Sequence, residues 1–208
     1  MSKVKGTIGY AEVVHRFIKA ADGIPFEILH HDFLKLIPTT NSLVLDIGAG
    51  FGRDAHILSM KGHEVIAVEP LAEFRKAGKE IYAQSNIKWI DDAFPDLGKL
   101  EGYNNRIDFI LSSGVWHHLN ESEQEASLER MAQLLKPNGI FAVSLRHGPA
   151  GAGTHVFPIN YHEIIEVAKS YHLQPLLTIT NQPSLMKNKE HVTWSRLALK
   201  KQDHIGQP

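Results

Sequence analysis

Residues 44–54 read Val44-Leu45-Asp46-Ile47-Gly48-Ala49-Gly50-Phe51-Gly52-Arg53-Asp54 and form the most informative stretch of this chain. An apolar, strand-like run with an acid near its end is followed by three glycines at alternate positions and then by the start of a helix. Glycine lets the backbone turn sharply off a strand and keeps side chains away from a ligand. We expect the N–H groups at the start of the helix to be free to meet a polar or anionic group. The stretch therefore predicts a site for an adenosine-containing ligand.

Composition excludes several classes of protein. The chain has 208 residues, 43% hydrophobic and 22% charged, which fits one domain with a core of its own. Its formal net charge of −1 gives no overall attraction to nucleic acid or to an acidic membrane. It has no cysteine, which excludes disulfides, thiolate metal sites and a cysteine nucleophile. Without a secretory signal at the N-terminus or an apolar run of about 20 residues, we expect a cytoplasmic protein.

Strand-like and helix-like patterns alternate from about residue 43 onward. This alternation predicts an α/β fold, a doubly wound and mostly parallel sheet with helices on both faces. The predicted strands are Leu43–Ile47, Glu64–Val68, Ile87–Ile90, Ile107–Leu111, Ile140–Leu145, Pro175–Thr180 and Val192–Leu199. The predicted helices among them are Asp54–Lys61, Leu71–Gln84, Glu121–Leu135 and Ile164–Tyr171.

Two more helices, Tyr10–Ala21 and Phe26–Ile37, are predicted before the first strand. We expect both to fold over the carboxyl edge of the sheet, where such folds bind ligands. The single domain then consists of an N-terminal helical cover (residues 1–40), a Rossmann-like core (residues 41–201) and a tail (residues 202–208). The predicted loops are Pro149–Thr154, a candidate lid over a site, and Asn181–Glu190.

Three acidic residues stand at the ends of the first three predicted strands. Glu69 follows the second strand, and its carboxylate can accept hydrogen bonds from both hydroxyls of a ribose. Asp46 precedes the first glycine, close enough to touch a cationic or amino group of a ligand. Asp92 follows the third strand, where its carboxylate could accept from an adenine amino group. The alternative for Glu69 is a solvated glutamate at a strand end.

Further motifs follow the glycine turn in order: Val68-Glu69-Pro70, Asp92-Ala93, Ser112-Ser113-Gly114-Val115-Trp116-His117-His118-Leu119 and Leu134-Leu135-Lys136-Pro137-Asn138-Gly139-Ile140. With these motifs, residues 40–200 resemble the class I S-adenosylmethionine-dependent methyltransferases. Asn138 stands where the family's "LKPGG" turn has a glycine. The motif Asp/Asn-Pro-Pro-Tyr/Phe of enzymes that methylate nucleic-acid bases is missing, so a small-molecule acceptor is expected rather than a nucleic acid.

The resemblance implies a fold, a reaction and a set of residues. The fold is a seven-stranded sheet whose last strand runs antiparallel to the others. The reaction is methyl transfer (EC 2.1.1) from S-adenosylmethionine, which leaves S-adenosylhomocysteine. Gly48 and Gly50 would contact the methionine moiety through their backbone, Glu69 would hold the ribose and Asp92 the adenine. The remaining positions of the donor site would be Asp46, Ala49, Gly52, Pro70, Ala93 and Ser113.

Two adjacent histidines are the candidate catalytic residues. Methyl transfer from a sulfonium depends mainly on proximity and a dry site, but a hydroxyl or protonated amine must also lose a proton to a base. The resemblance places the acceptor near the Ser112–His118 loop, and neutral His117 or His118 can act as a base near pH 7. The alternative is a packed or hydrogen-bonded role, which is common for histidine at the position of His118 in this family.

Four residues are candidates for binding the acceptor. Arg146 and His147 follow the fifth strand, where an arginine can clamp a carboxylate or phosphate or, alternatively, bind loop carbonyls. Tyr10 and Trp116 are predicted to line an aromatic pocket, with a place in the core as the alternative.

The thirteen histidines invite the hypothesis of a metal site, but the chain has no HExxH motif and no cysteine, so no metal is expected. Two other functions remain open: a catalytically inactive scaffold that binds an adenosyl ligand, and an NAD(P)-dependent oxidoreductase. Binding of S-adenosylhomocysteine or NADH separates them. The sequence leaves the acceptor and the oligomeric state open, and it predicts neither a nucleic-acid nor a membrane partner.

Overall fold

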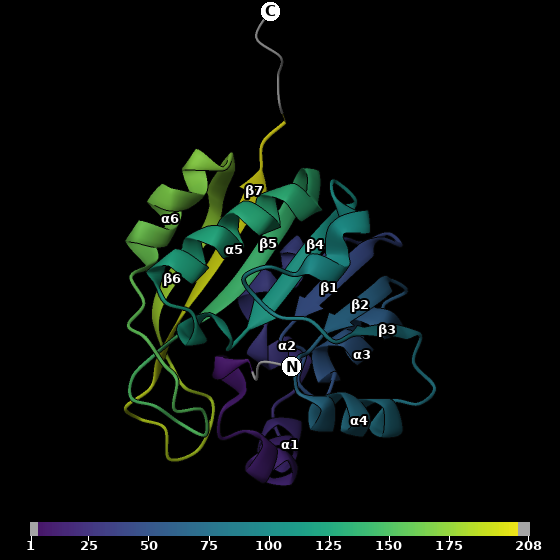
Figure 1. The fold of residues 1–208 in the computed structure, drawn as a ribbon, viewed down its shortest axis with the longest axis vertical. Helices are drawn as coiled ribbons and strands as arrows, with labels where there is room; N and C mark the ends of the chain where they lie inside the picture. Colours follow the sequence, from purple (N-terminus) through teal and green to yellow (C-terminus); the bar gives the residue numbers. More distant parts are fainter. Residues whose placement is uncertain (1–3, 204–208) are drawn as a thin grey trace, which may run out of the picture.

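The structure is a computed structural model that describes residues 4–203, apart from the side chain of Asp22, so residues 204–208 of the predicted tail lie outside it. Its centre is a seven-stranded sheet in the order β3-β2-β1-β4-β5-β7-β6 (Figure 1). The strands are β1 (Leu43–Ile47), β2 (Glu64–Val68), β3 (Ile87–Ile90), β4 (Ile107–Ser113), β5 (Leu135–His147), β6 (Leu173–Pro183) and β7 (Thr193–Lys201). Neighbouring strands from β3 to β5 are parallel, and β7 is antiparallel to both β5 and β6. The predicted doubly wound sheet with an antiparallel last strand is confirmed.

Helices cover both faces of the sheet. They are α1 (Val14–Asp22), α2 (Phe26–Leu29), α3 (Arg53–Met60), α4 (Ala72–Ile81), α5 (Glu121–Leu134) and α6 (Tyr161–Ser170), with 3-10 turns η1 (Lys5–Thr7), η2 (Ala11–Val13), η3 (His31–Leu36), η4 (Gly98–Tyr103) and η5 (Trp116–His118). In β1, Leu45 and Ile47 face the apolar layer under α5 and α6, while Val44 faces the layer under α3. This alternation follows from the two-residue period of a strand.

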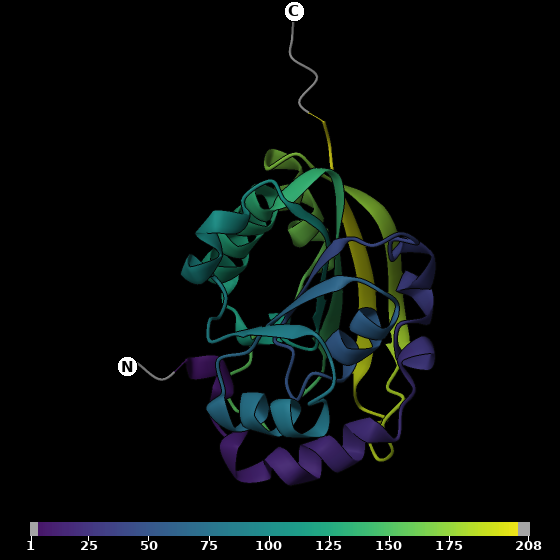
Figure 2. The same cartoon turned by 90° about the vertical axis from the view of Figure 1, so that its right-hand side faces the viewer.

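The N-terminal segment differs in part from its prediction. The expected helix Phe26–Ile37 is interrupted at His30 (φ −109°, ψ 23°), which divides it into α2 and η3. Phe26 and Phe33 are buried with Val44 and Leu58 on one face of the sheet, so this half of the cover does not lie over the carboxyl edge. Only α1 and the turns before it cross that edge, as Figure 2 shows. The apolar side chains of residues 26–37 find their largest apolar surface on the sheet itself, which explains the difference.

Strand and helix ends follow local chemistry. β1, β2 and β3 have the predicted bounds. α5 begins at a capping box, in which the Asn120 side chain accepts from the Glu123 N–H (3.0 Å) and the Glu123 carboxylate accepts from the Asn120 N–H (2.8 Å). Pro137 cannot continue the helix, and β5 begins already at Leu135 instead of Ile140. In the part of the chain that the structure describes, no helix has the length and apolar character needed to cross a bilayer.

Candidate functional site

A cavity of about 870 Å³ opens at the carboxyl ends of the parallel strands, a volume typical of small-molecule sites. Its floor is formed by the ends of β1, β2, β3, β4 and β5. The N-terminal turns with α1, the loop at residues 151–155 and the β6–β7 loop form its walls. The predicted lid, Pro149–Thr154, thus contributes Gly151 and Ala152 to the cavity wall.

The turn after β1 lines the cavity with Gly48, Ala49 and Gly50. The Gly48 and Ala49 N–H groups donate to the Val68 carbonyl (2.8 and 3.1 Å), and the Gly50 N–H donates to Glu69 Oε2 (2.9 Å). Gly50 has a positive φ of 55°, and a Cβ built there would have no heavy atom within 4 Å. The N–H groups of Gly48, Ala49 and Gly50 are therefore already bonded within the protein. The carbonyl oxygens of the turn are the groups that can face an ammonium group of a ligand.

Two predicted ligand contacts lie beneath this turn instead. Asp46 is 2% exposed and off the cavity wall. Burial and the nearby Asp54 raise the pKa of Asp46 well above its usual value, and the Ala55 N–H bonds to it. That N–H belongs to the first turn of α3, so the expectation that these groups are free for a ligand is wrong for Ala55. A Cβ on Gly52 would lie 2.7 Å from the Trp89 ring, so Gly52 packs against that ring rather than a ligand.

Glu69 holds a fixed position at the end of β2. It is buried, and its Oε2 and Oε1 accept from the N–H groups of Gly50 (2.9 Å) and Leu71 (2.8 Å). Burial raises the pKa of Glu69 to about 7, although both hydrogen bonds act in the opposite direction. Each carboxylate oxygen keeps a lone pair that can accept from a diol. The neighbouring Pro70 also lines the cavity.

Asp92 and Ser113 lie at the ends of the adjacent strands. Asp92 is half-buried and accepts from the N–H groups of Ala93 (2.9 Å) and Lys99 (2.8 Å), which fixes its carboxylate at the cavity. Ala93 and Ser113 line the cavity as predicted.

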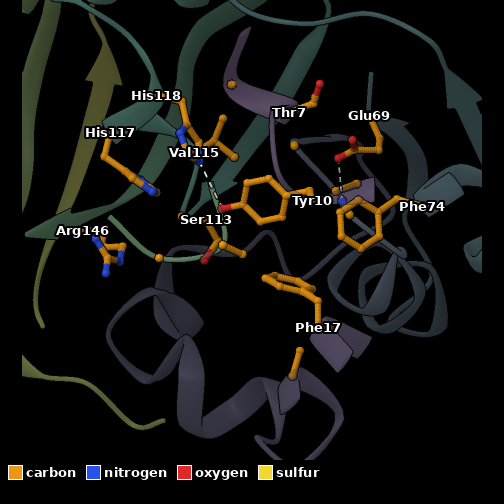
Figure 3. Close-up of a pocket in the computed structure, with 18 of the residues that line it drawn as sticks. Thr7, Tyr10, Phe17, Glu69, Phe74, Ser113, Val115, His117, His118 and Arg146 are labelled. Atoms are coloured by element: carbon orange, nitrogen blue, oxygen red, sulfur yellow. Dashed lines mark hydrogen bonds between the residues drawn. The ribbon is translucent and has the colours of Figure 1, made fainter. Parts of the chain in front are cut away.

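Tyr10 and His118 form a hydrogen-bonded pair over the cavity, marked by a dashed line in Figure 3. His118 Nδ1 lies 2.6 Å from the His155 carbonyl oxygen, which can only accept, so Nδ1 carries the proton. Nε2 of the neutral ring is then an acceptor for the Tyr10 hydroxyl at 3.2 Å. Burial lowers the pKa of His118 and raises the pKa of Tyr10, so both are neutral near pH 7.

His117 also lines the cavity, but its chemistry differs from that of His118. It is 5% exposed, and its Nδ1 has no hydrogen-bond partner among the described residues. Burial, with smaller effects of His118 and Arg146, lowers the pKa of His117 to about 3. An imidazole with so low a pKa is a weak base near neutral pH, which makes His118 the stronger catalytic candidate of the two.

The acceptor residues predicted from sequence separate into two groups. Tyr10 and Arg146 line the cavity, and Figure 3 shows Arg146 and Glu69 at opposite sides of the site. Trp116 does not: it is fully buried against Phe94 and Phe141, with ring centroids 5.5 and 5.6 Å away. His147 is also off the cavity wall, and its Nε2 lies 2.8 Å from Ser195 Oγ. The prediction that these two residues line the pocket is wrong.

Sequence reasoning missed Lys189, Trp194 and Arg196, which line the same cavity. They come from the β6–β7 loop and from β7, far from every motif. A signal was available: since an antiparallel last strand begins at the carboxyl edge of its neighbours, its first residues reach the site.

A buried ion pair ties the N-terminal cover to the first turn of α3. Asp54 binds His30 Nε2 and Arg53 Nε, each at 2.7 Å, and Arg53 Nη1 donates to the Ala21 carbonyl at 2.9 Å. Burial raises the pKa of Asp54, but the charges of His30 and Arg53 outweigh it and hold that pKa well below its usual range. Within residues 4–203, no three acidic or histidine side chains gather as metal ligands.

Comparison with known proteins identifies similar chains. Residues 44–139 match the sequence profile of a methyltransferase domain family. The chain is 29% identical over 139 residues to phosphoethanolamine N-methyltransferase 1 of Triticum aestivum, a match that covers 64% of this chain but only 27% of that protein. An uncharacterized methyltransferase of Bacillus mycoides is 25% identical over 90% of this chain and 89% of its own length.

A solved structure shares the fold over nearly the whole chain. The 1,6-didemethyltoxoflavin-N1-methyltransferase of Burkholderia thailandensis, solved with 1,6-didemethyltoxoflavin and S-adenosylhomocysteine, superposes with a TM-score of 0.67 and 22% identity. The superposition covers 93% of this chain and 86% of that one.

Proposed function

We propose that this chain, whose residues 44–139 match a methyltransferase domain family, acts as a class I S-adenosylmethionine-dependent methyltransferase. It would transfer the methyl group of S-adenosylmethionine to a small-molecule acceptor bound in the same cavity. The observation that carries the proposal is the division of this cavity. The fixed carboxylates of Glu69 and Asp92 lie at one end together with the glycine turn. The hydrogen-bonded pair of Tyr10 and His118 also lines the cavity.

The donor end suits an adenosyl ligand with a cationic amino-acid tail. Glu69 would accept from the ribose hydroxyls and Asp92 from the adenine amino group, each with its carboxylate already held by backbone N–H groups. The carbonyl oxygens of Gly48 and Gly50 would accept from the ammonium group. Asp46 and Gly52, set beneath the turn, would support its shape.

The donor supplies an activated methyl group, so the protein's part is to align the acceptor and take a proton. The acceptor's lone pair forms the new bond to carbon, and the pair of the breaking S–C bond returns to sulfur, which leaves S-adenosylhomocysteine. An acceptor N–H or O–H would give its proton to the Tyr10 oxygen as Tyr10 passes its own to His118 Nε2. The bond from His118 Nδ1 to the His155 carbonyl would stabilise the ring when it becomes charged.

A binding experiment tests the donor. Calorimetric titration with S-adenosylhomocysteine is expected to give low-micromolar affinity, about −8 kcal/mol, with no comparable affinity for NADH. Binding of NADH in its place would overturn the proposal in favour of an oxidoreductase.

Transfer of labelled methyl groups to a panel of small amines and hydroxyl compounds tests catalysis. With an acceptor found, Tyr10→Phe and His118→Ala are expected to lower kcat about 100-fold and to keep S-adenosylhomocysteine affinity within about twofold. His162→Ala, at an exposed histidine, is the matched control. Unchanged kcat in both variants would refute the proton path, and binding without transfer to any acceptor would favour an inactive scaffold.

A further inference from the structure

Arg196 is a buried arginine whose guanidinium is not satisfied by the protein. It lines the cavity but is only 6% exposed. Its Nη2 makes one long hydrogen bond, to the Leu29 carbonyl at 3.4 Å, and its Nη1 has no partner among the described residues. Burial of an unpaired guanidinium nitrogen costs free energy, so such a group in a native cavity calls for a ligand.

Two other well-packed arginines have side-chain acceptors, although Arg130 also leaves its Nε without a partner among the described residues. Arg53 pairs with Asp54, and Arg130 donates to Asn104 at 2.7 Å and to Gln133 at 3.0 Å. The two therefore have strong side-chain acceptors, which Arg196 lacks among residues 4–203. The Arg196 guanidinium instead makes a cation–π contact with Trp194, and its central carbon lies 5.3 Å from the ring centroid.

Two more cations lie at the same end of the cavity. In the β5–β7 register Arg146 is paired with Trp194 and Ser144 with Arg196, so Arg146 and Arg196 project from one face of the sheet. Arg146 makes one long bond, to the Gly148 carbonyl at 3.3 Å. Lys189 of the β6–β7 loop completes the set, and no described carboxylate forms an ion pair with any of the three.

The acids around the cavity are engaged elsewhere. Those that line it are Asp54, paired with Arg53; Glu69 and Asp92, bonded to backbone at the donor end; and Glu123, which caps α5. Behind the site, Asp32 acts on Arg196 at longer range and raises its pKa, although burial lowers that pKa more strongly. The β5–β7 end of the cavity is thus positively charged.

From this arrangement we infer that Arg196, together with Arg146 and Lys189, forms an anion site that binds a carboxylate or phosphate group of the acceptor. That the bound anion belongs to a methyl acceptor rests on the proposed function, whereas the binding of an anion at this site does not. A planar guanidinium binds either oxyanion through two parallel hydrogen bonds. Ser113, Ser144 and Arg196 lie in one row across β4, β5 and β7, so the Cα of Arg196 is roughly 10 Å from that of Ser113. A small molecule can span that distance from the donor end.

Binding of free anions tests the site without any turnover. The protein, with and without saturating S-adenosylhomocysteine, is titrated with inorganic phosphate and with acetate at constant ionic strength, and Trp fluorescence and calorimetry report binding. Trp194 stacks on the guanidinium, so phosphate is expected to change its emission, and Trp194→Phe should abolish the change. Tighter phosphate would indicate a phosphorylated acceptor, and tighter acetate would indicate a carboxylate.

Variants assign the binding to its residues. Arg196→Gln is expected to weaken binding of the preferred anion at least about tenfold and to keep S-adenosylhomocysteine affinity within about twofold. Arg106→Gln, at an exposed arginine outside the cavity, is the matched control. If Arg196→Gln does not fold, Arg196→Lys takes its place: it keeps the charge but loses the two parallel donors of the guanidinium, and it is expected to weaken anion binding about threefold. Lys189→Gln is expected to weaken binding by a similar factor.

Two results would overturn the inference: no saturable anion binding in the millimolar range, or binding that these variants leave unchanged. If the protein binds phosphate but not S-adenosylhomocysteine, the anion site is supported and the proposed function is refuted.

Discussion

Replacing Glu69 by glutamine removes a buried charge and is expected to change how stability depends on pH. The pKa of Glu69 is raised from its usual 4.5 to about 7, chiefly by burial. Between these two values the folded protein holds one more proton than the unfolded chain, so this group makes stability fall as pH rises. The shift corresponds to about 3 kcal/mol. The Glu69→Gln variant lacks this slope.

The quantity to measure is the difference in unfolding free energy between Glu69→Gln and wild type, obtained by urea unfolding at pH values from about 5 to about 8.5. From the lowest to the highest pH, the unfolding free energy of the variant is expected to increase relative to that of wild type by about 3 kcal/mol at most. The glutamine amide opposes one of the backbone N–H donors of Gly50 and Leu71, which shifts the curve by about 1 kcal/mol without tilting it. The lowered pKa values of His117 and His118 give a slope of the opposite sign, which is common to both proteins and cancels.

Glu64→Gln, at the exposed start of the same strand, is the control and is expected to run parallel to wild type. If the Glu69→Gln curve also runs parallel to wild type, Glu69 is already ionised at low pH in the folded state and the burial argument fails. The variant is also expected to bind S-adenosylhomocysteine more weakly above pH 7, because an amide replaces the ionised carboxylate that we propose accepts from the ribose.

Gly48→Ala is expected to cost about 2–5 kcal/mol of folding stability: left-handed backbone strains alanine by about 1–2 kcal/mol, and its Cβ would lie 2.1 Å from a valine side chain, an overpacking of about 1–3 kcal/mol. Gly50→Ala has only the backbone strain, yet should weaken S-adenosylhomocysteine binding about tenfold in calorimetry; equal urea midpoints for the two variants would contradict this reasoning. His30→Ala leaves Asp54 buried without one of its partners and should cost about 1–3 kcal/mol, against less than about 0.5 kcal/mol for His31→Ala at an exposed position; similar unfolding curves for both would show that the buried pair adds nothing.

The sequence predicts the core of the fold well because hydrophobic period and turn residues are local signals. The bounds of β1 and β2 follow from short apolar runs next to glycine or proline turns, and those of β3 from the polar residues Ser85-Asn86 and Asp91-Asp92 on either side of it. The break at His30 goes with contacts that are not local: the apolar side chains around it pack on the sheet, and its ring binds the buried carboxylate of Asp54, 24 positions later in the chain. A helical period therefore overestimates the length of that segment.

The site divides in the same way. The positions of Glu69 and Asp92 follow from strand ends, which a sequence reveals. Whether a side chain enters the cavity or the core depends on the face of the sheet, and adjacent residues such as Arg146 and His147 take opposite faces. Trp116 shows the other difficulty, since a large aromatic in a site motif is equally suited to the core. The cytoplasmic location and the absence of a metal stay predictions.

The donor end of the cavity is encoded in the central part of the chain, whereas the other end also draws on the flanking segments: His118 is central, but its partner Tyr10 is not. Gly50, Glu69 and Asp92 all fall within residues 44–139, the segment shared with the methyltransferase domain family. Tyr10 and Arg196 fall outside it, in the flanking segments. Under the proposed function, mutation or exchange of these flanks would change the acceptor that is bound and would leave the residues proposed to hold the donor unchanged. A single ancestral scaffold could diversify by changing its edges, and grafting the flanks of one relative onto the centre of another becomes a rational route to new acceptor specificity.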